Sequence, residues 1–200
     1  MTNPVARLDR NARFGHPGAV VWLTGLSGAG KSTIARHAEA RLFDSGYSTY
    51  RLDGDDLRRG LNRDLDFSVA GRRESTRRMA EVAALFADAG LIVIVAMISP
   101  FAADRTAARA VTATAFIEVF VDASIDTCAA RDPRGLYRRA RLGEIQNFTG
   151  ISSPYEPPPA PDLVLPTEQL PVEQAVTRLF DEVTRRAPLG QAGAPSPIAL

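Results

Sequence analysis

The sequence has little cysteine, no long apolar run and almost no excess charge. A single cysteine, Cys128, stands among 200 residues, which excludes an internal disulfide framework and a cysteine-rich zinc site. No apolar run reaches the roughly 20 residues that a membrane-spanning helix needs, and residues 1–14 hold no apolar stretch of signal-peptide type. We therefore expect a cytoplasmic protein with no membrane partner.

The charge balance argues against binding to nucleic acid over a broad surface. Lys and Arg total 24 and Asp and Glu total 23, which gives a formal net charge of +1. A protein that coats a polyanion normally carries a clear excess of positive charge. We expect no nucleic-acid partner, although the arginines crowded into 58–78 and 131–141 would suit two local sites for small anions.

Apolar runs alternate with helical patterns along the chain. Short runs typical of buried parallel strands occupy 19–24, 48–53, 91–98, 116–121 and 162–165. The run at 91–98 is the most apolar and is expected to form the central strand. Helical spacing of apolar residues follows the first run and marks two further helices, at about 72–89 and 172–183. This order predicts an α/β fold, a parallel β-sheet flanked by helices.

Three stretches fall outside this alternation. Residues 1–15 are polar and are expected to form a loose arm, and residues 187–200 are small, polar and proline-containing and are expected to be disordered. Residues 133–161, here called the lid segment, combine four arginines with several prolines. A long basic loop inside a compact domain is often a lid or a binding element. We therefore expect one domain over 16–186 with a basic lid.

A glycine-rich turn carries the clearest local motif. Residues 25–32 match G-x-x-x-x-G-K-[ST], between a predicted strand and a predicted helix. Glycines let successive backbone N–H groups point at phosphate oxygens, and the helix N-terminus adds a partial positive charge. Lys31 can reach the β- and γ-phosphates, and the Ser32 hydroxyl can ligate Mg²⁺. We predict that ATP and Mg²⁺ bind through Gly25, Leu26, Ser27, Gly28, Ala29, Gly30, Lys31, Ser32 and Thr33.

This glycine-rich turn is a phosphate-binding loop, or P-loop. It does not show which molecule accepts the phosphate, because GTPases, ATPases and small-molecule kinases all have one. The short chain and the lack of a base-reading N-K-x-D motif favour a kinase. Asp53 ends the second predicted strand, and Asp55 and Asp56 come directly after it. Strand carboxyl ends face the ligand crevice of an open parallel sheet. Acids there could hold Mg²⁺-linked water or accept the proton of an attacking hydroxyl. A solvated acidic turn is the alternative interpretation.

Arginines are dense just after these acids. Five of them lie between 58 and 73, and Phe67 lies among them. Arginine offers paired donors to phosphate or sulfate oxygens, and an aromatic ring can stack on adenine. The alternative is a solvated basic helix face.

Several stretches together resemble the adenylylsulfate (APS) kinases of sulfate activation. They are GLSGAGKSTIA, LDGDDLRRGLNRDLDFS, AEVAALFADAGLIVIVAMISPF, FIEVFVDASIDTCAARDPRGLYRRARLGEIQNFTGISSPYE and DLVL. They run in order over about 14–183, and the combination of DGD, ISPF, RDPRGLY and NFTGI-x-x-PYE is far more specific than the P-loop. The resemblance implies the P-loop kinase fold and transfer of the ATP γ-phosphate to the 3′-hydroxyl of adenosine 5′-phosphosulfate (APS).

The resemblance also implies roles for individual residues. Asp55 would orient the 3′-hydroxyl, Asp53 would support the Mg²⁺ shell, and Arg131 would approach the adenine of ATP. Because a P-loop kinase can transfer phosphate directly in line, Ser99 is expected to line the acceptor site and not to form a phosphoserine. The predicted catalytic residues are Lys31, Asp53, Asp55 and Ser99, with Ser32 and Asp53 at the metal. The predicted APS-binding residues are Asp55, Arg58, Phe67, Arg72, Ser75, Ile98, Ser99, Gln146, Phe148 and Thr149.

Five positions depart from the residues usual in that family. Asp56 stands at a usual Asn, Asp66 at a usual Gly, and Gly71 at a usual Asp. Ser75 replaces an Asn that helps hold the acceptor, and Gln146 replaces a basic residue. Two alternatives therefore stay open: a P-loop kinase of another small alcohol, and a regulatory nucleotide-binding domain without turnover. The intact P-loop and DGD segment favour the active kinase, and a homodimer is an assembly that the sequence allows.

Overall fold

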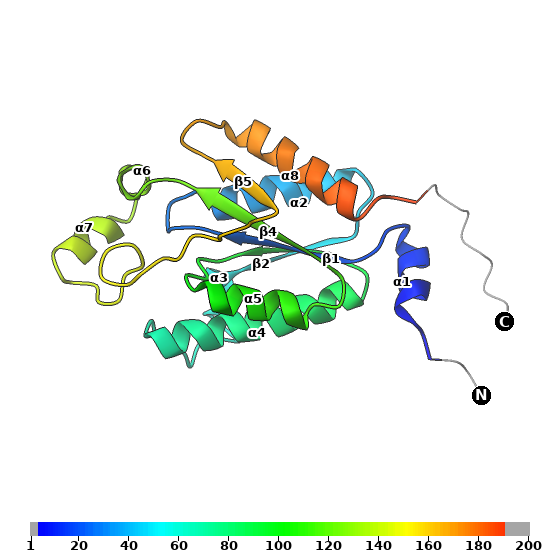
Figure 1. Cartoon of the computed structure of the whole chain (residues 1–200), viewed down its shortest axis with the longest axis horizontal. Coiled ribbons are helices and arrows are strands. Elements are labelled where there is room, and N and C mark those ends of the chain that lie inside the picture. The colour runs from blue at the N-terminus through cyan, green and yellow to red at the C-terminus, as the bar shows by residue number, and fades with distance from the viewer. Residues whose placement is uncertain (1–3, 191–200) are drawn as a thin grey trace.

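The computed structural model describes residues 4–190, which form a five-stranded sheet between two layers of helices (Figure 1). The strands are β1 (Ala19–Thr24), β2 (Thr49–Asp53), β3 (Ile92–Ala96), β4 (Ala115–Asp122) and β5 (Leu163–Pro166). Their order is β2-β3-β1-β4-β5 and every neighbouring pair is parallel, so all carboxyl ends meet at one edge. The predicted α/β class is confirmed.

The central strand is β1, so the prediction that 91–98 holds this place is wrong. β1 pairs with β3 on one side and with β4 on the other. Both β1 and β3 are buried along their whole length. A highly apolar sequence therefore indicates a strand that is buried on both faces of the sheet. It does not show which of two equally buried strands lies at the centre.

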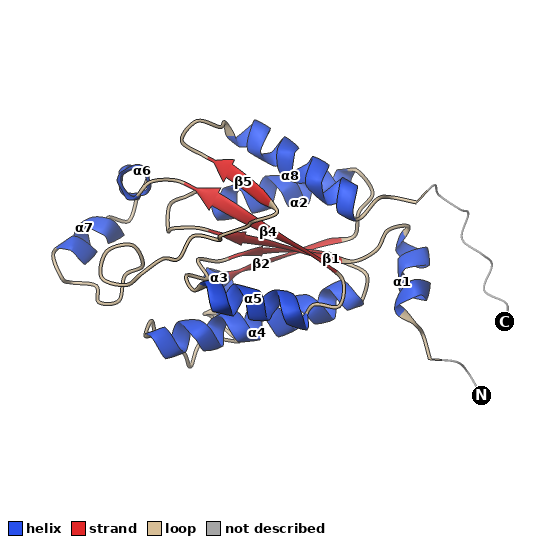
Figure 2. Cartoon of the chain, in the orientation of Figure 1, coloured by secondary structure: helices blue, strands red, loops and turns tan. Residues whose placement is uncertain are grey.

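Helices cover both faces of the sheet (Figure 2). On one face lie α2 (Lys31–Asp44) and α8 (Val172–Arg186), and on the other lie α4 (Val69–Asp88) and α5 (Ala102–Val111). Three short helices follow carboxyl ends of strands or connect them: α3 (Gly54–Leu57), α6 (Ile125–Ala130) and α7 (Leu136–Arg141). The connections that carry function thus gather at one edge.

Side chains of β1 alternate between two cores. Val21 and Leu23 pack with residues of α2 and α8, whereas Val20 and Trp22 pack with residues of α4. Trp22 is fully buried, as its place in the apolar run predicts. Its indole Nε1 donates to the Ser99 Oγ at 3.1 Å, so the second core reaches the carboxyl edge of the sheet.

The predicted loose arm, residues 1–15, is wrong for its second half, which forms α1 (Arg7–Phe14). The Arg10 guanidinium lies 3.3 Å from the Asp88 carboxylate at the end of α4. Local contacts also cap this polar helix, since the Ala6 N–H donates to Asp9 Oδ2 at 2.8 Å and Gly15 ends the helix in the left-handed conformation. Because none of its residues is buried, the apolar spacing that marked the other helices did not reveal it.

The predicted disordered tail, residues 187–200, is wrong at its start. Ala187 is fully buried, and its carbonyl oxygen accepts a hydrogen bond from the Tyr47 hydroxyl at 2.9 Å. Residues 191–200 lie outside the described residues.

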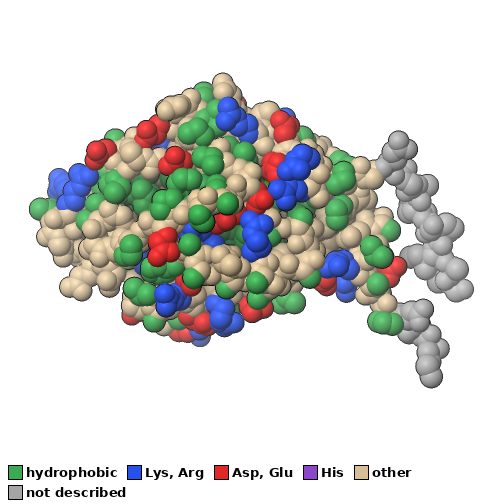
Figure 3. Space-filling model, in the orientation of Figure 1, with side chains coloured by type: hydrophobic (Ala, Val, Ile, Leu, Met, Phe, Trp, Pro, Cys, Tyr) green, Lys and Arg blue, Asp and Glu red, His purple; other side chains and the backbone are tan. Residues whose placement is uncertain are grey.

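Charges of both signs are interspersed on the face shown in Figure 3. Between residues 4 and 190, no helix has the length and apolar character needed to span a membrane. The expectations about nucleic acid and membranes stay predictions.

Candidate active site

The carboxyl edge of the sheet opens into a cavity of about 830 Å³. Ligands of open parallel sheets bind at this edge. The lining includes every residue predicted for the site except Gly25 and Leu26. The carbonyl oxygens of those two residues instead accept hydrogen bonds from the Lys31 ammonium, at 2.9 and 2.7 Å. The fold thus brings together residues that the sequence scatters from 27 to 149.

The P-loop is a tight turn between β1 and α2. Gly28 has a φ of +82°, and a Cβ at this position would lie 2.8 Å from the carbonyl oxygen of Cys128. Only glycine fits that conformation and that approach. Cys128 itself is fully buried, as expected of a core residue. Because α2 begins at Lys31 with no side-chain cap and no acid in its first turn, its N-terminus favours an anion.

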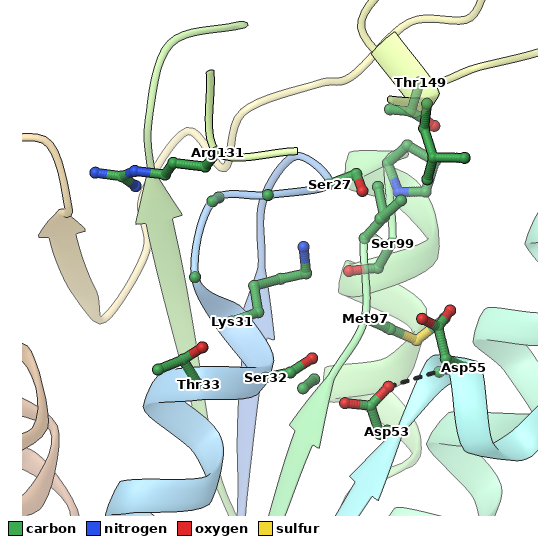
Figure 4. A pocket seen from close by; sticks show the side chains of 18 of the residues that line it. Ser27, Lys31, Ser32, Thr33, Asp53, Asp55, Met97, Ser99, Arg131 and Thr149 are labelled. Atoms are coloured by element: carbon green, nitrogen blue, oxygen red, sulfur yellow. Dashed lines mark hydrogen bonds between the residues drawn. The ribbon is translucent and has the colours of Figure 1, made fainter. Parts of the chain in front are cut away.

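Lys31 lies under the P-loop in the wall of the cavity (Figure 4). Burial lowers the pKa of Lys31 to about 8, against the opposing effect of nearby negative groups that include Asp53 and Asp55. Phosphate oxygens beside the ammonium would raise this pKa again, because negative charge favours the protonated amine.

Oxygen donors suited to Mg²⁺ lie on two neighbouring elements, the Ser32 hydroxyl on α2 and the Asp53 carboxylate at the end of β2 (Figure 4). Asp53 Oδ1 accepts a hydrogen bond from the Asp55 N–H at 3.0 Å, which fixes the carboxylate. No cluster of three or more His, Cys, Asp or Glu within residues 4–190 could hold a metal. A few protein oxygens fit Mg²⁺, which usually completes its shell with water and phosphate oxygens.

Asp55 faces the lid segment across the cavity. Its side chain is 74% exposed, and its Oδ2 lies 3.8 Å from an Arg134 guanidinium nitrogen. Such an exposed pair contributes little stability, but the carboxylate is open to a hydroxyl that needs a proton acceptor. Arg134 also lines the cavity and was missed from the sequence. Its place in the RDPRGLY stretch was the available signal.

Three predicted acceptor residues form one cluster. The Arg58 guanidinium lies 3.9 Å from the centre of the Phe67 ring, and that of Arg72 lies 5.5 Å away. Arg72 donates to the Phe67 carbonyl at 3.0 Å and to the Asn147 carbonyl of the lid segment at 2.6 Å. Phe67 stays 55% exposed, so its ring remains open to stacking on a planar base.

Two of the departures from the family pattern touch each other. A Cβ at Gly71 would lie 2.4 Å from the Oδ1 and 2.6 Å from the carbonyl oxygen of Asp66. The Asp66 Oδ1 accepts hydrogen bonds from the N–H of Ser68 at 3.1 Å and from its hydroxyl at 2.6 Å, and Ser68 is the N-cap of α4. The aspartate at 66 therefore supports the cap, and glycine at 71 leaves room for it.

Ser75 is buried in the acceptor wall, where its Oγ accepts a hydrogen bond from Asn62 Nδ2 at 3.0 Å. Within residues 4–190 the buried Asn62 Oδ1 has no hydrogen-bond partner. The sequence did not point to Asn62. Gln146 and Thr149 line the same cavity from the lid segment.

The lid segment and its approach are joined to the P-loop. The Tyr137 hydroxyl donates to the Ser27 carbonyl at 2.7 Å. Arg131 donates to the Thr167 hydroxyl oxygen at 3.0 Å, and the Thr167 hydroxyl in turn lies 2.9 Å from the Ala29 carbonyl oxygen. Neither Tyr137 nor Thr167 was predicted for the site. No local pattern marks them, because each contact joins distant parts of the chain.

Fold and site together define a P-loop kinase, with a phosphate cradle on one wall of the cavity and an exposed carboxylate on the other. The family model for adenylylsulphate kinase matches residues 17–166. The chain belongs to this family, so the resemblance and the kinase class predicted from the sequence are confirmed.

Individual relatives agree with this assignment. The adenylyl-sulfate kinase of Geotalea uraniireducens is 53% identical over 184 residues, which cover 92% of this chain and 88% of that protein. The Mycobacterium tuberculosis APS kinase CysC in complex with AMPPNP and APS is similar with a TM-score of 0.81 and 48% identity, over 84% of this chain and 98% of that one. A gluconokinase from Sinorhizobium meliloti 1021, at 18% identity and a TM-score of 0.55 over 84% of this chain and 93% of that one, shows the shared fold alone.

Proposed function

We propose that this chain transfers the γ-phosphate of ATP to the 3′-hydroxyl of APS and releases ADP and 3′-phosphoadenosine 5′-phosphosulfate. The observation that carries the proposal is the single cavity in which the P-loop faces Asp55 and the Arg58–Phe67–Arg72 cluster, in a chain of this family. The complex of the M. tuberculosis relative with AMPPNP and APS supports the same pair of ligands.

On the donor side, the triphosphate lies along the backbone amides of the P-loop with Lys31 at its β- and γ-phosphates. Ser32 and Asp53 hold Mg²⁺, which neutralises phosphate charge when it is bound. Arg131, fixed beside the P-loop by Thr167, flanks the adenine of ATP. Positioning and charge stabilisation supply most of the rate in phosphoryl transfer.

On the acceptor side, Asp55 accepts the proton of the 3′-hydroxyl and aims its oxygen at the γ-phosphate. Phe67 stacks on the adenine of APS, and Arg58 and Arg72 hold its anionic groups with paired N–H donors. The remaining acceptor contacts come from Ser75, Ile98, Ser99, Gln146, Phe148 and Thr149. Transfer is directly in line, without a phosphoserine at Ser99. The cytoplasmic location and the homodimer stay predictions.

A coupled assay of ADP release tests this function. The purified protein should release ADP with ATP, Mg²⁺ and APS, and should stop when a chelator removes the Mg²⁺. Gluconate and shikimate, tested in place of APS, should give only background. Turnover with another alcohol and not with APS would assign a different acceptor. ATP binding without any turnover would identify a regulatory nucleotide-binding domain.

A further inference from the structure

Arg105 is a buried arginine outside the proposed donor and acceptor contacts. It lies on α5, is 2% exposed and is among the largest fully buried side chains of the described residues. A guanidinium is costly to bury unless its charge and its N–H groups are paired. The partners of Arg105 therefore indicate what the residue does.

The guanidinium reaches three separate segments. Its Nε donates to the Glu118 carboxylate on β4 at 2.8 Å. One terminal nitrogen donates to the Ser99 carbonyl at 2.7 Å, and the other donates to the Glu156 carbonyl at 2.7 Å. The planar fork of one arginine thus joins the sheet, the loop after β3 and the lid segment.

The loop after β3 needs such a contact. Ser99 has a φ of +39°, which is uncommon for a residue other than glycine. A residue in such a conformation persists only where its surroundings hold it. Ser99 also lines the cavity, with Ile98 before it and Pro100 after it. Trp22 and Thr24 join this loop to β1, and Arg105, by binding the Ser99 carbonyl, joins it to α5, to β4 and to the lid segment.

The lid segment is joined to the same loop a second time. The Glu156 N–H donates to the Pro100 carbonyl at 2.8 Å, and the Glu156 carboxylate accepts a hydrogen bond from the Ala102 N–H at 2.7 Å. Phe148 and Thr149, which line the cavity, lie a short way before Glu156 in the chain. The place of Glu156 therefore limits where those two residues can lie.

We propose that Arg105 is a positioning residue that sets the distance between the Ser99 loop and the lid segment, and through it the acceptor side of the cavity. The inference rests on the proposed function, because it assigns the effect to the acceptor. None of the hydrogen bonds or ion pairs of Arg105 in the described structure involves the P-loop. Binding of ATP should therefore not depend on it.

Arg105→Lys tests the proposal. Lysine keeps a positive charge near Glu118, but its three donors share one nitrogen, whereas the guanidinium reaches the carboxylate and the two carbonyl oxygens with three separate nitrogens. The KM for APS should rise about tenfold, whereas the KM for ATP should change by less than about twofold, because only the acceptor side loses its placement. Glu156→Ala removes one of the two hydrogen bonds of the second connection, the one from the Ala102 N–H to the carboxylate, and it should raise the KM for APS about threefold with the same selectivity.

Arg109→Lys is the matched control. Arg109 lies on the same helix and donates to the Phe116 carbonyl at 2.9 Å and to the Asp162 carboxylate at 2.6 Å. Its described hydrogen bonds reach neither Ser99 nor Glu156. This variant should leave both KM values near those of the wild type, even if it lowers Tm.

The outcomes separate a positioning role from a structural one. A purely structural Arg105 would lower Tm and the active fraction and would leave the two KM values unchanged or shifted together. The proposal would be overturned if, in both Arg105→Lys and Glu156→Ala, the KM values for APS and ATP stayed unchanged or rose by the same factor. A wild-type protein that releases no ADP with APS would refute the proposed function instead, and the assignment of Arg105 to the APS side would fail with it.

Discussion

The two walls of the cavity are built in different ways. The donor wall is centred on one continuous stretch, 25–33, in which a glycine turn and the start of α2 follow directly after β1. The acceptor wall combines the end of β2, the stretch 58–75, the loop after β3 and the lid segment. The shape of the donor wall therefore comes mainly from local backbone conformation, with distant residues such as Tyr137 and Thr167 joined to it, whereas the acceptor wall is assembled from distant segments.

The cations of the two walls differ as well. The donor wall holds Lys31, the only lysine among 200 residues, and the acceptor wall holds arginines packed against Phe67. A lysine is a compact point charge that titrates when buried, whereas arginine stays charged and presents a planar fork. A change in one wall should accordingly affect one substrate more than the other.

Removal of one charged group from each wall should have the largest effect. Lys31→Ala and Asp55→Asn should each lower kcat at least about a hundredfold, as is usual when a charge-stabilising or proton-accepting group is lost. Only Lys31→Ala should also weaken binding of AMPPNP, measured by calorimetry. Asp56→Asn is the matched control, because Asp56 is exposed and does not line the cavity. A near-normal kcat for Asp55→Asn would remove Asp55 from the mechanism.

The contact between Asp66 and Gly71, two residues of the acceptor wall, predicts an effect on the free energy of unfolding. Gly71→Ala should lower the free energy of unfolding in urea by about 1–3 kcal/mol, because the added methyl overlaps Asp66. The double variant Asp66→Gly/Gly71→Asp should recover most of this loss, since an acid at 71 can cap Ser68 from within the helix.

Gly60→Ala is the control for this effect, because a Cβ at Gly60 meets nothing within 4 Å. If Gly71→Ala were as stable as the wild type, Asp66 would have room to move away and the two positions would not be coupled.

The depressed pKa of Lys31 predicts a pH effect confined to the donor wall. Below a pH of about 8 the ammonium is already protonated, so binding of AMPPNP with Mg²⁺ should not depend on its titration. Above this pH the Lys31 amine is mostly neutral, so it must take up a proton when AMPPNP binds. The Kd of AMPPNP should therefore rise by up to about tenfold per pH unit. Because no other lysine is present, amine-selective labelling followed by peptide mapping can separate the titration of Lys31 from that of the α-amino group. A Kd that stays constant from pH 7 to about 10 would contradict the burial of a titrating ammonium.

The two remaining departures should give the smallest effects, on the acceptor alone. Ser75→Asn adds an amide that can donate to the unpaired Asn62 Oδ1 and can reach further toward APS. Gln146→Lys adds a positive charge at the lid segment. Each should lower the KM for APS a few-fold, about 1 kcal/mol or less, and added salt should reduce the gain from Gln146→Lys.

Gln174→Lys, which adds the same charge at an exposed position on α8 that does not line the cavity, should have no such effect. An unchanged KM for APS in both Ser75→Asn and Gln146→Lys would show that neither position contacts the acceptor.

The same contrast explains what the sequence could predict. The P-loop and the strand before it were predicted at their observed places, because the glycines and the apolar run act locally. The acceptor residues were assigned through the family resemblance, and composition alone left a solvated acidic turn and a basic helix face open. The contact of Asp66 with Gly71 appears in the sequence only as two separate departures.

Other features left no local signal. The hydrogen bond from Tyr137 to Ser27 and the one from the buried guanidinium of Arg105 to Glu156 both join residues far apart in the chain. In the sequence, Arg105 is one arginine among several, in a stretch where no helix was predicted and where the structure has α5. Only the folded chain shows that its charge is paired and its donors are shared between two loops.

In the proposed reaction the γ-phosphate of ATP moves to the 3′-hydroxyl of APS, which the acceptor wall holds. Phosphorus NMR of a reaction with ATP, Mg²⁺ and APS tests it directly. We expect loss of the ATP γ-signal and a new phosphomonoester signal coupled to the ribose 3′ proton, with the phosphosulfate intact. A new phosphate at any other position, or ATP consumption that yields only inorganic phosphate, would contradict it.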